Sequence, residues 1–305
     1  METPFSKPGR FYKGNLHTHS NLSDGLRTPE QVCRFYADAG YDFISLTDHF
    51  LERYGWPVAD TRAFETGRFV TIPGAELHPP TDTMEHGREW HIVAVGLPYD
   101  FAAPHQLETG PEMARRALDA GAWVAAAHPN WFAMTENDMR ALGPVHAIEI
   151  YNASCTDDND TAESTYMLDY MLARGMRVGA CATDDAHFVL NTRDRAAGWT
   201  MVKAEANTPE ALLAALKRGD AYCSTGPEII DLQVVPGEKL TVRCSPASRV
   251  FMIGGPAVYR QIGEAGITEA EFDLTGWKSP FARILVRDDH GRKAWSNPIW
   301  FDAAK

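Results

Sequence analysis

Nine side chains of the types that bind metal ions lie beside short apolar segments between residues 17 and 187. They are His17, His19, Asp24, His49, Glu76, His91, His128, Asp185 and His187. Histidine together with carboxylate suits zinc, manganese or iron. In His17-x-His19 both side chains can face one ion, and Asp185-x-His187 is expected to repeat that geometry from across the fold. The pattern predicts a site for two or three divalent ions, and therefore a hydrolase.

Short β-like segments alternate with helical ones, which predicts an α/β fold with a parallel sheet closed, or nearly closed, into a barrel. The expected strands cover residues 11–16, 42–46, 69–72, 91–95, 123–127, 147–151, 178–182 and 199–202. In such barrels the chemistry lies at the C-terminal ends of the strands, and most of the nine residues follow a strand. His91 instead begins one, so that strand is antiparallel or a loop folds back.

Residues beyond Gly226-Pro227 have a different character. Short β-like segments separated by glycine, proline and aspartate turns replace the helical patterns. They predict a small β-sandwich-like C-terminal domain. The expected domains are therefore 1–225 and 226–305.

The composition of the chain limits which partners it is expected to bind and where it is expected to be located. The formal charge is −12, which offers no general attraction to long nucleic acids or anionic membranes. The five cysteines are odd in number and widely spaced, as expected for reduced thiols. Residues 1–10 lack an apolar signal core and no apolar run approaches membrane-spanning length, so a cytoplasmic location is expected. The oligomeric state is not predicted.

Several short motifs together resemble the PHP (polymerase and histidinol phosphatase) domain. They are Leu16-His17-Thr18-His19-Ser20, Ser23-Asp24-Gly25, Leu46-Thr47-Asp48-His49, Pro73-Gly74-Ala75-Glu76, Ala127-His128-Pro129 and Thr183-Asp184-Asp185-Ala186-His187. The resemblance covers about residues 10–225 and implies a distorted seven-stranded β/α barrel with a trinuclear metal site.

The same resemblance implies how the nine residues divide among three ions. One ion would be held by His17, His19, Glu76 and Asp185. The second would be held by Glu76, His91 and His128, and the third by Asp24, His49 and His187. Residues 219–227, followed by a β-domain, also resemble the branch that includes carbaryl hydrolases.

Further residues are assigned supporting roles. Asp48 and Asp184 are expected to support ligands from behind, with Asp184 alternatively carrying a proton. Asn152 ends a strand without a ligand and is interpreted as a contact to the substrate or to a ligand residue, or as a turn residue. Arg193 and Arg195 follow the last motif and are candidates to clamp a phosphate, although loop arginines are common.

Three functions fit this pattern. The preferred one is hydrolysis of a small phosphomonoester or phosphodiester by a metal-bridging hydroxide, with Asp185 and His187 as catalytic residues. The substrate would be a small, anionic molecule. The alternative is an aryl ester or carbamate hydrolase that uses the same metal centre. The third is a non-catalytic binding module in which metals only stabilise the fold.

Overall fold

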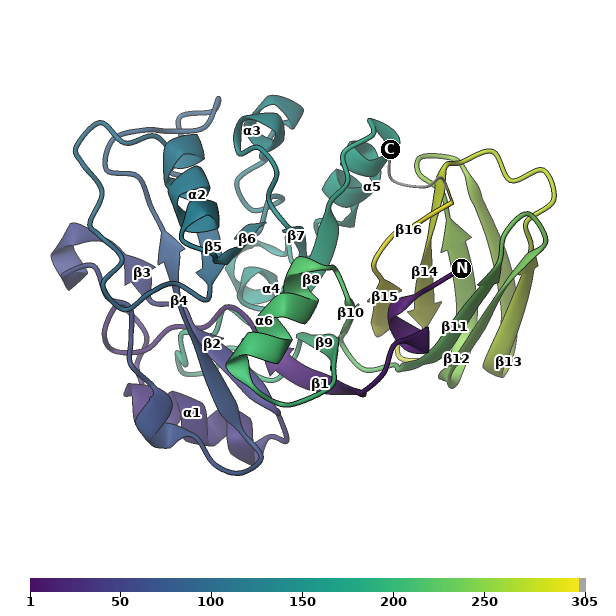
Figure 1. Cartoon of the computed structure of the whole chain (residues 1–305), viewed down its shortest axis with the longest axis horizontal. Coiled ribbons are helices and arrows are strands. Elements are labelled where there is room, and N and C mark those ends of the chain that lie inside the picture. Colours follow the sequence, from purple (N-terminus) through teal and green to yellow (C-terminus); the bar gives the residue numbers. More distant parts are fainter. Residues whose placement is uncertain (302–305) are drawn as a thin grey trace.

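The computed structural model describes residues 1–301, which form one extended sheet covered by helices at one end (Figure 1). The strands of the larger part are β1 (Arg10–Asn15), β2 (Phe43–Leu46), β3 (His49–Phe50), β4 (Val70–Leu77), β5 (Ile92–Val95), β6 (Trp123–Ala126), β7 (Ala147–Asn152), β8 (Gly179–Thr183), β9 (Trp199–Ala204) and β10 (Ala221–Ser224). The helices are α1 (Pro29–Asp38), α2 (Gly110–Asp119), α3 (Glu136–Ala141), α4 (Ser154–Asn159), α5 (Thr165–Ala173) and α6 (Pro209–Lys217), with 3-10 turns η1 (Pro4–Ser6), η2 (Glu52–Tyr54) and η3 (Arg62–Phe64).

Threonine begins four of these helices. Thr28, Thr109, Thr135 and Thr208 each accept a hydrogen bond from the backbone N–H three residues on, which satisfies a donor that the helix itself leaves free. Thr28 and Gln31 also form a capping box, in which the Gln31 side chain accepts the Thr28 N–H. The sequence reading missed α3 and α4, each of only six residues.

The sheet is mixed, so the expectation of a parallel sheet holds only in part, and of the two alternatives left open for the strand that begins at His91 the antiparallel one is found. β1, β2 and β4 are parallel neighbours, as are β6, β7 and β8. β5 runs antiparallel to both β4 and β6, and β9 runs antiparallel to β1. The connection from β4 to β5 contains no helix that would return the chain to the starting edge, so β5 runs back along β4. The start of β5, where His91 lies, therefore meets the C-terminal end of β4.

Side chains join β8 to β9 and to the C-terminal strands. Thr200 Oγ1 accepts the Ala182 N–H at 3.1 Å and lies 3.0 Å from the Ala182 carbonyl, to which it donates. Asn297 Oδ1 accepts the Ala180 N–H at 2.7 Å. Within residues 1–301 no backbone ladder joins β8 to β9. A closed seven-stranded barrel therefore stays a prediction.

The C-terminal strands continue the same sheet. They are β11 (Ile229–Val235), β12 (Lys239–Ile253), β13 (Tyr259–Asp273), β14 (Phe281–Arg287), β15 (Lys293–Ser296) and β16 (Ile299–Trp300). β10 pairs with β9 on one side and β15 on the other. The long hairpin of β12 and β13 bends at irregularities between Arg243 and Arg249, so that one half of β12 pairs with β11 and the other with β14.

The N-terminal segment packs on the C-terminal strands. Thr3 Oγ1 donates to the Leu232 carbonyl of β11 at 2.8 Å, and Figure 1 shows η1 beside that strand. Arg283 of β14 forms two hydrogen bonds of 2.6 Å with Asp169 of α5. The predicted domain boundary at residues 225 and 226 stays a prediction. Among residues 1–301, no helix has the length and apolar character needed to cross a lipid bilayer.

Candidate metal centre

The first and last sequence motifs lie side by side. Thr18 and Ala186 form a parallel β-bridge, the Asp185 N–H donates to the His17 carbonyl at 2.8 Å, and the His19 N–H donates to the Ala186 carbonyl at 3.0 Å. The expectation that the two motifs face each other from opposite sides was therefore wrong. The bridge joins the segments that follow β1 and β8, two strands that are not paired with each other, and it brings four potential ligands close together.

Glu76 lies at the centre of the cluster. Its side chain is 1 % exposed at the end of β4. His91 Nδ1 is 2.7 Å from Oε1 and His49 Nδ1 is 2.6 Å from Oε2. His128 Nε2 lies 3.3 Å from Oε1. A carboxylate with imidazoles on both oxygens is placed to bridge two ions.

A second group surrounds Asp24. The two Asp24 carboxylate oxygens lie 3.4 Å from His49 Nε2 and 3.4 Å from His187 Nε2. The His19 ring packs against both histidines, with centroids 4.3 Å from His49 and 4.2 Å from His187. Asp24 and His187 are the more exposed members, so this group lies toward solvent.

All nine predicted residues converge. Among the groups whose ligand atoms lie within 4.8 Å of one another, three consist only of predicted residues: His17, His19 and Glu76; Glu76, His91 and His128; and His19, Asp24, His49 and His187. Asp185 joins the first group, with Oδ1 2.8 Å from His19 Nε2 and 3.2 Å from His17 Nε2. These groups match the division that the motif resemblance implied, apart from the additional place of His19. The role of the nine as ligands stays a prediction.

The unpaired atoms of the cluster fit divalent ions. His17 Nε2 and Glu76 Oε2 are buried and have no hydrogen-bond partner within residues 1–301, although other imidazole and carboxylate atoms surround them. A buried polar atom without a partner is costly, and an ion among these atoms would satisfy it. The donor set of imidazole nitrogens and carboxylate oxygens suits zinc, manganese or iron.

Burial and mutual charge set the protonation of the cluster. Burial lowers the pKa of His91 to about 3, and burial with the neighbouring His187 and His49 lowers the pKa of His19 to about 3. Both rings are thereby held in the neutral form that metals bind. Burial opposes ionisation of Glu76, yet His91, His49 and His17 hold its pKa well below the usual range. Burial also opposes protonation of His49, but Glu76 and Asp24 raise its pKa to about 10.

Two of the nine residues have unusual backbone conformations. His128 has φ of 25° and Asp185 has φ of 52°, both in the left-handed region that non-glycine residues rarely adopt. The His128 N–H donates to Glu149 Oε2, and the Asp185 N–H donates to His17. Neighbouring groups thus hold the strained backbone in place, a pattern common at functional sites.

Glu149 was missed by the sequence reading. It lies in β7, 1 % exposed, and its Oε1 is 2.9 Å from His17 Nδ1 and accepts the Thr183 hydroxyl at 2.5 Å. Oε2 accepts the His128 N–H at 2.7 Å and the Asn152 side-chain amide at 2.9 Å. The sequence does contain a signal for Glu149, since it is a single acid in an otherwise apolar strand. An acid that is buried there needs hydrogen-bond or charge partners.

His78 also belongs to the cluster. It follows Glu76 by two residues, so both side chains leave the end of β4 on the same side. Its Nε2 lies 2.8 Å from His49 Nδ1 and 3.5 Å from Glu76 Oε2. The Glu-x-His spacing was a signal for this position, but a loop histidine is commonly solvated.

The predicted supporting residues organise loops and ligands. Asp48 accepts hydrogen bonds from Ser20 and Ser23, which fix the turn that carries Asp24, and forms none with His49 within the described residues. Asp184 accepts the N–H groups of residues 196–198 and the Tyr36 hydroxyl. Burial raises the pKa of Asp184 to about 6.

The three residues predicted to contact the substrate, Asn152, Arg193 and Arg195, lie outside the lining of the cavity. Asn152 Nδ2 donates to Asp185 Oδ2 at 3.0 Å, so it orients a predicted ligand. The Arg195 guanidinium donates to carbonyls of its own loop, and the Arg193 N–H donates to Asp157 at 2.5 Å. None of the three lines the cavity over the cluster, so their role in substrate binding stays a prediction.

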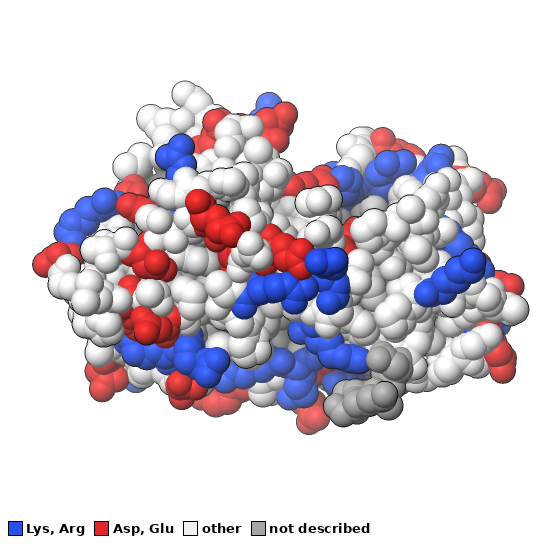
Figure 2. Space-filling model, turned by 90° about the horizontal axis from the view of Figure 1, so that it is seen from above, with Lys and Arg blue, Asp and Glu red and all other residues white. Residues whose placement is uncertain are grey.

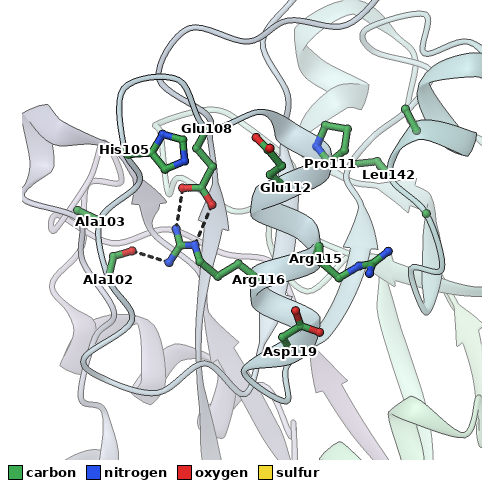
Figure 3. Close-up of a pocket in the computed structure, with 12 residues that line it drawn as sticks. Ala102, Ala103, His105, Glu108, Pro111, Glu112, Arg115, Arg116, Asp119 and Leu142 are labelled. Carbon is green, nitrogen blue, oxygen red and sulfur yellow. Dashed lines mark hydrogen bonds and ion pairs between the residues drawn. The ribbon is translucent and has the colours of Figure 1, made fainter.

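A cavity of about 180 Å³ opens onto the cluster. It is lined by Asp24, His49, Glu76, His91, His128, Trp131, Cys155, Asp158, Asp185 and His187. A larger hollow of about 680 Å³ lies along α2, but it contains none of the nine residues, and its Arg116 is already paired with Glu108 (Figure 3). The smaller cavity is therefore the one that combines access with reactive groups.

Several solved structures are similar to this chain, and three of them are described here, whereas no family model and no curated protein matches it. The first is a two-domain protein from Bacteroides vulgatus that contains a predicted PHP-like metal-dependent phosphoesterase. It has a TM-score of 0.54 and 15 % identity, and the alignment covers 92 % of this chain and 93 % of that one.

The other two structures are less similar. A protein from Bifidobacterium adolescentis, named only provisionally as a metal-dependent phosphoesterase, has a TM-score of 0.41 at 13 % identity. An amidohydrolase from Chromobacterium violaceum with bound sulfate and no metal has a TM-score of 0.43 at 17 % identity. Each alignment covers 57 % of this chain and 87 % of the other, and these scores are too low to establish a shared fold. The chain therefore shares its overall fold with the PHP-like two-domain protein.

Proposed function

We propose that the chain is a metal-dependent hydrolase of small phosphomonoesters or phosphodiesters. The observation that carries this proposal is the convergence of the nine predicted residues around Glu76, with His17 Nε2 and Glu76 Oε2 left unpaired beneath an open cavity. When bound, zinc, manganese or iron would supply an activated water and neutralise anionic oxygens. The arrangement of β1 to β9 is also consistent with the distorted PHP barrel.

The side chains of the chain itself have separate tasks in this proposal. Glu149 fixes the His17 ring and Asn152 fixes the Asp185 carboxylate, so the site is held in shape before a substrate enters. Trp131 forms an apolar wall of the cavity. Asp185 and His187 are the proposed catalytic residues that move protons at the reacting group.

Charge favours a small anionic substrate. Three divalent ions (+6) against the ligand carboxylates of Asp24, Glu76 and Asp185 (−3) would leave a local surplus of +3. The whole chain has a formal charge of −12, which opposes long polyanions. On the face in Figure 2, lysine and arginine are interspersed with aspartate and glutamate, as suits a small substrate better than nucleic acid.

Aryl ester or carbamate hydrolysis is the second candidate. Trp131 lines the cavity and Phe132 packs on His91 with centroids 4.6 Å apart, whereas no lysine or arginine lines it among residues 1–301. An aromatic wall without a cation suits a neutral aryl group. The carbaryl-hydrolase resemblance also favours this candidate.

One set of assays tests both candidates. Purified protein is stripped with a chelator, reloaded with manganese, zinc or iron, and assayed on p-nitrophenyl phosphate, bis-p-nitrophenyl phosphate and a naphthyl ester. We expect metal-dependent turnover that is fastest on a phosphate, and its collapse in His128→Ala while the fold survives. Faster turnover of the naphthyl ester by orders of magnitude would favour the second candidate. Metal binding without any turnover would favour a non-catalytic module.

A further inference from the structure

Asp158 is the free carboxylate of the cavity. Seven of the ten lining residues belong to the predicted ligand set, and the other three are Trp131, Cys155 and Asp158. Tryptophan cannot transfer a proton near neutral pH, and burial raises the pKa of the Cys155 thiol far above its usual range. Asp158 is therefore the acid that can act in this cavity without being a predicted ligand.

Helix α4 fixes where Asp158 lies. Cys155 and Asp158 are three residues apart, so they share one face of the helix, and both line the cavity. The Cys155 N–H donates to Asn152 Oδ1 at 3.2 Å, and the Ser154 N–H donates to the Asp184 carbonyl at 3.0 Å. The end of β7 and the residue directly before Asp185 thus hold α4. This fixes Asp158 relative to the predicted catalytic group.

Asp158 is not engaged elsewhere. Asp158 is exposed at the cavity, and within residues 1–301 its carboxylate accepts no hydrogen bond and forms no ion pair, in contrast to Glu76 and Asp185 of the same cavity. A carboxyl group that lines the cavity without a partner in the protein is free to contact a bound substrate and to exchange a proton with it.

We propose that Asp158 is the general acid that protonates the leaving-group oxygen. This inference rests on the proposed function. Water adds to the phosphorus or carbonyl carbon and loses one proton to a base of the site. The bond from that atom to the leaving oxygen breaks, its electron pair stays on oxygen, and the oxygen takes the Asp158 proton. The products are an alcohol or phenol and the free acid group, and Asp158 regains its proton from solvent.

The leaving group provides a specific test, because a good leaving group needs no proton whereas a poor one does. The experiment compares kcat/KM of metal-loaded wild type and Asp158→Asn on aryl phosphates and aryl esters, from p-nitrophenyl to unsubstituted phenyl. We expect the kcat/KM of Asp158→Asn to fall a few-fold on the p-nitrophenyl substrate and about 100-fold or more on the phenyl substrate.

Two variants and one measurement serve as controls. Asp160→Asn changes an exposed aspartate of the same segment that does not line the cavity, so it should match wild type on every substrate. Asp158→Glu keeps an acid and should retain most of the wild-type dependence on the leaving group. Metal content of all variants, measured by elemental analysis, should be unchanged.

The outcomes separate this inference from the proposed function. Turnover by Asp158→Asn with the wild-type dependence on the leaving group overturns the acid role and leaves the hydrolase intact. Loss of bound metal in Asp158→Asn overturns it as well, since Asp158 would then support the ions. Wild-type protein that is metal-loaded but inactive on every phosphate and ester overturns both.

Discussion

Glu149 Oε1 lies 2.9 Å from His17 Nδ1, on the side of the imidazole ring that faces away from Glu76. Burial opposes ionisation of Glu149, but His17 lowers its pKa below the usual range. A carboxylate in this place holds the proton of His17 on Nδ1, which leaves Nε2 free to bind an ion. The cluster is therefore shaped by a residue outside the predicted ligand set.

Replacement of Glu149 should weaken metal binding. Glu149→Gln places an amide group where four donors now converge, so at least one N–H would face another donor. We expect metal affinity to fall about 10- to 100-fold. The free energy of unfolding of the metal-free variant should fall by about 1–3 kcal/mol. Competition titration with a chromophoric chelator and denaturant unfolding measure the two effects.

A surface replacement provides the control for that experiment. Glu136 lies on α3 and pairs with Arg140 outside the cavity, so Glu136→Gln should leave metal affinity unchanged. Equal affinity of Glu149→Gln and wild type would contradict the role assigned to Glu149.

His78 should contribute to metal binding through His49. If His49 binds an ion through Nε2, its Nδ1 carries a proton, and His78 Nε2 at 2.8 Å can accept it. We expect His78→Ala to lower metal affinity about 10-fold and His78→Gln, which keeps an acceptor, to lower it less. Elemental analysis after dialysis measures the ions retained. The exposed His86→Ala is the control, and retention of every ion by His78→Ala would rule out this role.

The sequence predicted the members of the cluster better than their arrangement. The nine residues were identifiable because histidine and acid recur beside apolar segments, as at His17 and His19. Their arrangement in space could not be predicted, because the pairing of Thr18 with Ala186 joins residues that are 168 positions apart in the sequence. For the same reason Glu149 was not identified and His78 was interpreted as a loop histidine, since each acts through a partner that only the folded chain brings near.

Strand positions were predictable, but strand directions were not. The predicted segments overlap β1, β2 and β4 to β9, because buried strands are short and apolar. Direction depends on how the chain returns, and the helix-free connection before β5 made that strand antiparallel. β15 (Lys293–Ser296) and β10 (Ala221–Ser224) were not predicted, because each contains serine or lysine, unlike the wholly apolar β5 and β6 of the same length.

Asn297 should stabilise the seam at β8. It accepts the Ala180 N–H at 2.7 Å and donates to the Gly219 carbonyl at 2.9 Å, so it joins the C-terminal strands to the larger part. Asn297→Ala leaves the Ala180 N–H without its partner, which costs about 1–3 kcal/mol of unfolding free energy. Denaturant unfolding measures the loss, with the exposed Asn21→Ala as control. Equal midpoints for wild type and Asn297→Ala would show that the seam does not depend on this contact.

His146 should make the stability depend on pH. Burial, with a smaller effect from Lys217, lowers the pKa of His146 to about 4 from 6.5, and its Nδ1 accepts the Val124 N–H at 3.1 Å. Protonation would turn that acceptor into a second donor. The unfolded chain therefore binds a proton at His146 more readily than the folded chain, and the free energy of unfolding should fall as pH drops from about 6.5 to about 4.

The variant that isolates this effect is His146→Asn, whose Oδ1 can replace the Nδ1 acceptor but does not titrate. Melting temperatures of the metal-free wild type and variant are compared from pH 7.5 to pH 4. The wild type should lose more stability than the variant across the range between the two pKa values, and the two should differ little in slope above it. Parallel curves throughout would mean that the Val124 contact survives protonation, and that the acid sensitivity of the fold arises elsewhere.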